Sequence, residues 1–281
     1  DEYLSYKKDV IRNRSWKRNE NSMRHLINFF GDYKLSSITP SDIIDYQNKR
    51  LKDTINNHPI KPATVNRELA CLRSLFNFAK QRNKFFGENP VSKVKFLEEN
   101  NQMERILSYD EEERLLNSCP SYIKPIVITA LGTGMRKMEI LSLKWENVDL
   151  TNNVIIIEAT NSKTKKKKLV PISSKLKNEL LKQKLKTGYQ EYVFLTSKGA
   201  NFKGPDSLTK VFHNVCKDAG IGKIRFHDLR HTFATRGIEL TGNVVAVSKI
   251  LGHRDLQTTM RYVHPDKSLF ETVERISNHK S

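Results

Sequence analysis

Cysteine is scarce in this chain. Its three cysteines, Cys71, Cys119 and Cys216, lie far apart and show no paired spacing. Neither a disulfide framework nor a zinc knuckle fits that distribution, so it points to a reducing, cytoplasmic setting.

Long apolar runs are also absent. No stretch approaches the ~18 consecutive apolar residues of a membrane span, and no signal-peptide pattern opens the chain. We therefore expect no membrane partner. The first residue is Asp1 rather than Met, from which we expect that preceding residues are missing.

Acidic residues are too few to balance the basic ones. Across 281 residues, 49 Lys and Arg face 31 Asp and Glu, which gives a net charge of +18. The excess is +7 in residues 1–100 and +11 in residues 101–281, so it is not confined to a tail. Basic side chains that contact phosphates release counterions and supply most non-specific affinity for nucleic acid. The partner we expect is therefore nucleic acid, the alternative being a basic protein with another role.

The first ninety residues show a helical pattern. Apolar residues recur at helical intervals over three segments, and the second and third open with Pro40 and Pro62, as first helical turns often do. The segments are 15–30, 39–51 and 62–78. Gly87 and Pro90 are expected to end the third helix. We predict a helical domain over residues 1–90 and a polar linker over 91–107.

From residue 108 the pattern changes. Ser108 and Glu111 have the Ser-x-x-Glu spacing of a helix capping box. Short apolar runs at 154–157 and 169–172 flank a lysine-rich turn, which predicts a small β-hairpin. Helices are expected over 122–143 (interrupted at 132–134), 173–186, 206–219, 228–240, 244–251 and 268–277. The fold class is therefore α+β, mainly α, with a mixed domain over residues 108–281.

Four separated segments, 132–140, 161–164, 227–231 and 251–262, carry polar residues that can do chemistry. Each has an ordinary interpretation when taken alone. Residues 132–134 can be a helix break, because the Gly-Lys-Ser/Thr ending of a phosphate-binding loop is missing. His227 and His231 have the spacing of a zinc pair. However, Asp228 replaces the Glu that follows the first His in a zinc protease, and no third ligand is evident, so no metal is expected.

Together the four segments resemble the tyrosine recombinases, the family of phage integrases and Xer-type chromosome resolvases. The family pattern is Arg with an acidic residue three later, Lys in a β-hairpin, His-x-x-Arg, then His or Trp, then Tyr. The matching residues here are Arg136, Glu139, Lys163, His227, Arg230, His253 and Tyr262. The Leu-Gly-His motif of the family stands at 251–253, and the resemblance covers residues 108–265.

The resemblance implies a role for each residue in phosphodiester cleavage. Arg136 and Arg230 would clamp the non-bridging oxygens, because guanidinium forks match phosphate bidentately. Tyr262 would attack the phosphorus to give a 3′-phosphotyrosyl bond without a cofactor. A phenol of pKa ~10 is a poor nucleophile at neutral pH, so His227 would accept its proton. His253 would hydrogen-bond a phosphate oxygen.

Further residues receive supporting roles by the same resemblance. Lys163, eight residues before Pro171, would protonate the departing 5′-oxygen; the lysines at 165–168 compete with it for this role. Glu139 would hold an arginine in place. Three arginines are predicted phosphate contacts, with a solvated surface as the alternative: Arg225, Arg254 and Arg261. His231 and His264 are expected to be structural.

The resemblance also implies partners and assembly. Double-stranded DNA recombination sites would be the substrate, and the helical domain would close a clamp around that DNA; a protein–protein module is the alternative for this half. Leu269, Phe270, Val273 and Ile276 have helical spacing, and such a tail would link protomers in a homo-tetramer or pack on its own chain. A site-specific recombinase or integrase of a mobile genetic element is the function we predict. A type IB topoisomerase-like strand transferase and a non-cutting DNA-binding protein are the alternatives.

Overall fold

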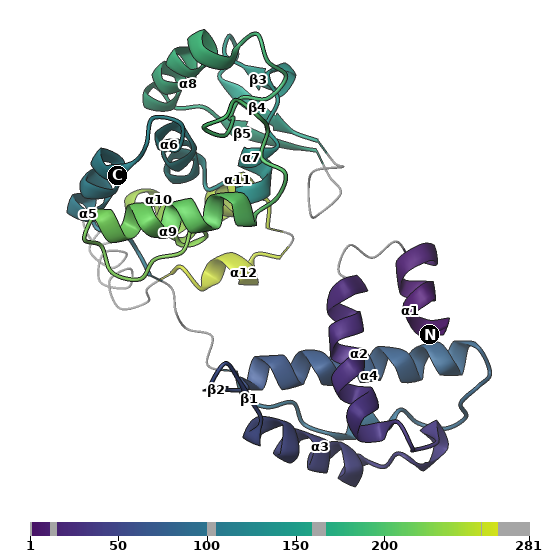
Figure 1. The fold of residues 1–281 in the computed structure, drawn as a ribbon. Coiled ribbons are helices and arrows are strands. Elements are labelled where there is room, and N and C mark those ends of the chain that lie inside the picture. The colour runs from purple at the N-terminus through teal and green to yellow at the C-terminus, as the bar shows by residue number, and fades with distance from the viewer. Residues whose placement is uncertain (1, 12–15, 100–104, 159–166, 254, 264–281) are drawn as a thin grey trace, which may run out of the picture. The chain divides into compact units, whose positions relative to one another are not determined.

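The computed structural model describes residues 2–11, 16–99, 105–158, 167–253 and 255–263. The chain divides into two compact units, residues 1–102 and 103–281 (Figure 1). Helices dominate both, and each contains one small antiparallel sheet. The prediction of an α+β, mainly α fold is confirmed.

The first unit is built on helices that pack around α4. Its helices are α1 (Glu2–Ser5), α2 (Trp16–Phe30), α3 (Pro40–Lys52) and α4 (Pro62–Gln81), and its hairpin is β1 (Thr54–Ile55) with β2 (His58–Pro59). α3 begins at a capping box, in which the Thr39 hydroxyl accepts from the Asp42 amide at 3.3 Å. The Asp42 carboxylate accepts from the Thr39 amide at 2.8 Å. Such reciprocal bonds satisfy amides that have no partner inside a helix.

A buried ion pair joins α3 to α4. The Arg50 guanidinium donates to Glu68 from Nε at 3.0 Å and from Nη2 at 3.0 Å. The Tyr46 hydroxyl donates to the same carboxylate at 2.7 Å. All three side chains are buried, and a buried charge is tolerated when it is paired and hydrogen-bonded.

Described residues on both sides of residues 100–104 pack into the cores of the two units. Val91 and Val94 lie in the core of the first unit, and Leu107 lies in the core of the second. The Asn66 side chain also donates to the Leu97 carbonyl at 2.8 Å. The boundary between the units falls between residues 102 and 103, whereas our predicted linker spanned 91–107.

The end of the third helix also differs from the prediction. α4 stops at Gln81, before Gly87 and Pro90. Asn83 then turns the chain with a φ of 55°, a left-handed conformation that asparagine tolerates. The predicted stop signals therefore lie beyond the helix.

The second unit surrounds a three-stranded sheet with helices. Its strands are β3 (Val148–Asp149), β4 (Val154–Ile157) and β5 (Lys168–Pro171), in the order β3-β4-β5. Its helices are α5 (Tyr109–Ser118), α6 (Lys124–Thr133), α7 (Lys137–Leu141), α8 (Ser174–Thr187), α9 (Asp206–Asp218), α10 (Asp228–Thr241), α11 (Val244–Leu251) and α12 (Gln257–Met260). The predicted hairpin is β4 and β5; the two-residue strand β3 was missed. The helix predicted over 268–277 lies outside the described residues.

Two predicted helix boundaries are confirmed. The Ser108 hydroxyl accepts from the Glu111 amide at 3.2 Å, and the Glu111 carboxylate accepts from the Ser108 amide at 3.1 Å. α6 ends at Thr133, and Gly134 follows with a φ of 62°. A Cβ at Gly134 would stand 2.5 Å from a ring carbon of Phe233. The left-handed φ and the lack of room for a Cβ both require glycine at 134, two residues before Arg136.

Gly252 ends α11 under a similar double constraint. Its φ is 66°, and an added Cβ would stand 2.7 Å from Cδ of Lys168 on β5. Gly242 ends α10 with a φ of 65°, but nothing lies within 4 Å of its position for a Cβ. The two glycines therefore share a conformation and differ in crowding.

We predict that Gly252→Ala destabilises the chain more than Gly242→Ala does. The left-handed conformation costs either alanine roughly 1–2 kcal/mol. Displacing the buried Lys168 side chain should cost Gly252→Ala roughly 1–3 kcal/mol more. Urea unfolding followed by circular dichroism measures both free energies of unfolding. Equal losses would show that Lys168 does not crowd Gly252.

Candidate active site

The structure brings most of the predicted catalytic residues into one region of the second unit. They come from the start of α7, from α10, from the end of α11 and from the turn after α12. The described residues in the region are Arg136, Glu139, His227, Arg230, His253 and Tyr262. Lys163 and Arg254 lie outside the described residues.

Arg136 is held by the carboxylate one helical turn away. As the residue before α7, it donates from Nη1 to Oε1 of Glu139 at 2.9 Å, and from its amide to Oε2 at 3.0 Å. Nη2 also lies 3.4 Å from the Gly252 carbonyl oxygen. The Glu139 side chain is buried, whereas the Arg136 side chain is 25% exposed. A partly exposed guanidinium on a buried carboxylate can still reach an incoming anion.

Arg230 is buried and anchored to two helix ends. Nη1 donates to the Gly134 carbonyl at 2.6 Å, and Nη2 donates to the Leu251 carbonyl at 2.8 Å. Burial, followed by the charge of nearby Arg136, lowers the pKa of Arg230 to about 10. The guanidinium therefore stays charged at neutral pH, in an environment that favours an additional anion.

A lysine outside the first set of candidates joins this cluster. Nζ of Lys168 lies 3.0 Å from Oε2 of Glu139, and its side chain is 9% exposed. Burial alone would raise the pKa of Glu139, but Lys168 and Arg136 outweigh it and the pKa is lowered. From sequence, Lys168 was only one of four lysines that competed with Lys163. Its buried contact with Glu139 was not foreseen.

His253 is oriented by a buried threonine. Its Nδ1 lies 2.6 Å from the Thr259 hydroxyl of α12. Burial, together with the charges of Arg230 and Arg136, lowers the pKa of His253 to about 4. The imidazole is therefore neutral at pH 7. A neutral ring offers one N–H donor, so it can donate a hydrogen bond without adding charge to the site.

Tyr262 contacts a histidine that we expected to be structural. Its hydroxyl lies 2.9 Å from Nδ1 of His231, and the tyrosine is buried. His227 lies edge-on to His231, with 4.8 Å between the ring centroids. The i,i+4 spacing that suggested a zinc pair therefore places both rings on one face of α10. In the sequence, this four-residue spacing was the feature that could have identified His231 as a residue of the site.

The other basic candidates near the site differ in their surroundings. Arg225 forms an ion pair with the buried Asp228 at 2.7 Å, and its side chain is 60% exposed. Arg261 is exposed and contributes to the lowered pKa of His253. His264 lies outside the described residues.

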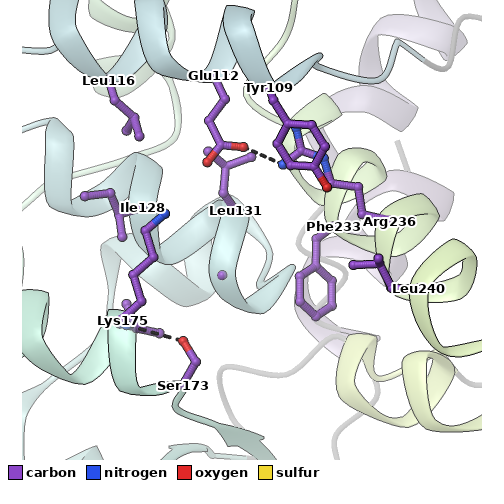
Figure 2. Close-up of a pocket in the computed structure, with 13 residues that line it drawn as sticks. Tyr109, Glu112, Leu116, Ile128, Leu131, Ser173, Lys175, Phe233, Arg236 and Leu240 are labelled. Atoms are coloured by element: carbon purple, nitrogen blue, oxygen red, sulfur yellow. Dashed lines mark hydrogen bonds and ion pairs between the residues drawn. The ribbon is translucent and has the colours of Figure 1, made fainter.

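A separate cavity of about 340 Å³ opens between α5, α6, α8 and α10 (Figure 2). Apolar side chains such as Leu116, Phe233 and Leu240 line it, beside an ion pair between Glu112 and Arg236. None of the predicted catalytic residues that the structure describes lines this cavity. The described part of the candidate site therefore does not lie in this apolar cavity.

The described residues hold neither a metal site nor a membrane-spanning helix. Among the described residues, no group of three or more His, Cys, Asp or Glu is placed to hold a metal ion. Within the same part of the chain, no helix combines the length and the apolar character of a membrane crossing.

Known proteins match both units. Residues 95–268 match the phage integrase family, and residues 6–98 match the phage integrase N-terminal domain. The integrase of Haemophilus phage HP1 is 31% identical over 91% of this chain and 72% of its own length. The integrase of Escherichia phage P2 is 31% identical over 75% of this chain and 58% of its own length. A shufflon-specific DNA recombinase of Escherichia coli is 33% identical over 82% of this chain and 59% of its own length.

Solved structures show the same fold. The Tn1549 transposon integrase in complex with transposon right end DNA superposes with a TM-score of 0.79 at 21% identity, over 98% of both chains. A lambda integrase dimer bound to a core site superposes with a TM-score of 0.76 at 18% identity, over 94% of this chain and 95% of that one. With family matches over both units, the chain belongs to the phage integrase family, the tyrosine-type site-specific DNA recombinases.

Proposed function

We propose that this chain cleaves and rejoins double-stranded DNA at recombination sites through a 3′-phosphotyrosyl bond to Tyr262. One observation carries the proposal. Arg136 and Arg230 are bonded to the consecutive carbonyls of Gly252 and Leu251, next to His253. Two guanidinium groups beside a tyrosine hydroxyl are the parts that phosphoryl transfer needs when no metal takes part.

The reaction exchanges one ester bond for another. The Tyr262 oxygen attacks phosphorus, the bond to the 5′-oxygen breaks, and the proton of the phenol passes to a base. Lys163 gives a proton to the departing 5′-oxygen. Charge that develops on the non-bridging oxygens is balanced by Arg136 and Arg230. A 5′-hydroxyl from another strand then reverses the steps and completes strand exchange.

Two histidines can receive the proton of Tyr262. His227 is the acceptor predicted from sequence. The hydrogen bond between the Tyr262 hydroxyl and Nδ1 of His231 supports His231 as the first partner of the hydroxyl, with the His227 ring next to it. His253 supplies a hydrogen bond to a phosphate oxygen, because its lowered pKa keeps it neutral.

The first unit supplies a second DNA contact. A hollow of about 370 Å³ between α1, α2 and α4 is lined by Lys7, Arg18 and Arg67, and no carboxylate is among the described residues that line it. Basic side chains without acidic neighbours attract the phosphate backbone. We assign the helical domain over residues 1–90 to clamping DNA, with Arg225, Arg254 and Arg261 as further phosphate contacts.

We also propose how copies of this chain assemble and where they act. Four copies would act together on two recombination sites, linked through the tail of residues 264–281, whose apolar residues have helical spacing. The relatives that match include phage integrases, which supports a mobile genetic element as the source. Cys71, Cys119 and Cys216 are free thiols, which supports action in the reducing cytoplasm.

Tyr262→Phe should bind DNA as the unchanged chain does but never become linked to it. The test uses a nicked duplex, built on the site recovered by binding selection, from which the short 5′ fragment diffuses away. A denaturing gel, run after incubation with EDTA, should show a covalent species for the unchanged chain only. Anisotropy titrations at one salt concentration check that both proteins bind equally. A covalent species from Tyr262→Phe would remove Tyr262 as the nucleophile.

Lys163→Ala should slow cleavage according to the leaving group. With an ordinary 5′-oxygen we expect a loss of roughly 100- to 10,000-fold, the range for general acid catalysis. With a 5′-thio leaving group, which needs no proton, the loss should nearly vanish. Single-turnover rates on the two nicked duplexes measure this. Equal slowing on both would assign the acid to another residue.

A further inference from the structure

Lys168 is buried among the charges of the candidate site. It is the first residue of β5 and lies five residues after Lys163. Its side chain is 9% exposed, whereas the adjacent Lys167 is 60% exposed. Burying an ammonium group costs free energy that its partners must offset. Lys168 is therefore unlike the solvated lysines of a surface turn.

The partners of Lys168 are those that orient Arg136. Nζ binds Oε2 of Glu139 at 3.0 Å, while the guanidinium of Arg136 binds Oε1 at 2.9 Å. The Lys168 stem packs on Gly252, whose carbonyl oxygen receives Nη2 of Arg136. Two of the contacts that hold the Arg136 side chain are thus also contacts of Lys168.

The charges in this cluster do not cancel. Among the described residues, three cations, Arg136, Lys168 and Arg230, lie around the carboxylate of Glu139, which leaves an excess of two positive charges. Burial and the two arginines lower the pKa of Lys168, and Glu139 opposes them. A phosphodiester brings one negative charge and gains more in the transition state. The cluster is therefore matched to an anion that arrives with the substrate.

We propose that Lys168 is a positioning residue for the phosphate clamp, which it serves by sharing the Glu139 carboxylate with Arg136. Without Lys168, Arg136 is the cation that remains hydrogen-bonded to the buried Glu139 carboxylate, and it is drawn toward that carboxylate. The positive charge near the phosphate then falls by one, and the Arg136 guanidinium is no longer oriented toward the phosphate. This inference rests on the proposed recombinase function.

The test compares cleavage by Lys168→Met on three nicked duplexes. On the ordinary phosphate we expect single-turnover cleavage to slow roughly 10- to 100-fold, the range for displacing an oriented catalytic group. A neutral methylphosphonate at the scissile position has less charge to balance, so the loss there should shrink to a few-fold. A 5′-thio leaving group should not rescue the variant, because Lys168 acts on the phosphate oxygens.

Matched variants separate this role from folding. Lys168→Arg should recover most of the rate, because it keeps the charge. Lys182→Met removes an exposed ion pair to Glu179 on α8 and should cleave as the unchanged chain does. Lys168→Met combined with Glu139→Gln should be less impaired than the product of the two single losses, because both act through one interaction.

Other outcomes would overturn the inference. Equal slowing on phosphate and methylphosphonate would make Lys168 a merely structural residue. Rescue by the 5′-thio duplex alone would make it the acid. An unimpaired Lys168→Met would leave the recombinase function intact and reject the inference. Absence of a covalent species from the unchanged chain would instead reject the proposed function itself.

Discussion

The hydrogen bonds of the buried Arg230 guanidinium hold the candidate site together. Each joins α10 to a helix end, one to the Gly134 carbonyl after α6 and one to the Leu251 carbonyl at the end of α11. A glycine with a left-handed backbone conformation stands at each helix end. Gly134 itself accepts the first bond, and Gly252 follows Leu251, which accepts the second. Arg136 lies two residues after the first glycine, and His253 directly follows the second. The two hydrogen bonds of one guanidinium therefore tie together the segments that carry Arg136 and His253.

Among its described residues, the site also carries more positive than negative charge. The described carboxylates near these basic residues are already in ion pairs: Glu139 binds Arg136 and Lys168, and Asp228 binds Arg225. A buried excess of charge destabilises the chain without DNA, because desolvation has no full compensation. It also supplies stabilisation that becomes available only when a phosphate enters. This is the expected trade between stability and preorganised catalysis.

Local sequence signals predicted most elements, whereas the candidate catalytic residues came from the family resemblance. The capping box at Ser108, the helix start at residues 39–42, the apolar runs of β4 and β5 and the helix break at residues 132–134 act within a few residues, so their spacing predicts them. Strands of two residues, such as β3, carry too little pattern to be seen. The end of α4 was misplaced because an asparagine, rather than Gly87, provides the left-handed turn.

Contacts between distant residues could not be predicted in this way. Nothing in a run of four lysines distinguishes the one whose ammonium group reaches Glu139, 29 residues earlier. The partner of Tyr262 is likewise set by how α10 meets the turn after α12. Family resemblance selected the candidate residues, whereas the three-dimensional arrangement shows which of the described ones are in contact.

The most direct measurement of the central claim is the identity of the residue joined to DNA. The covalent complex formed on a nicked duplex can be digested with nuclease and trypsin and examined by mass spectrometry. Cleavage after Arg261 and Lys267 would release the peptide of residues 262–267. We expect this peptide to carry a nucleotide linked through a 3′-phosphate to Tyr262. A nucleotide on any other residue, or a 5′-phosphate linkage, would contradict it.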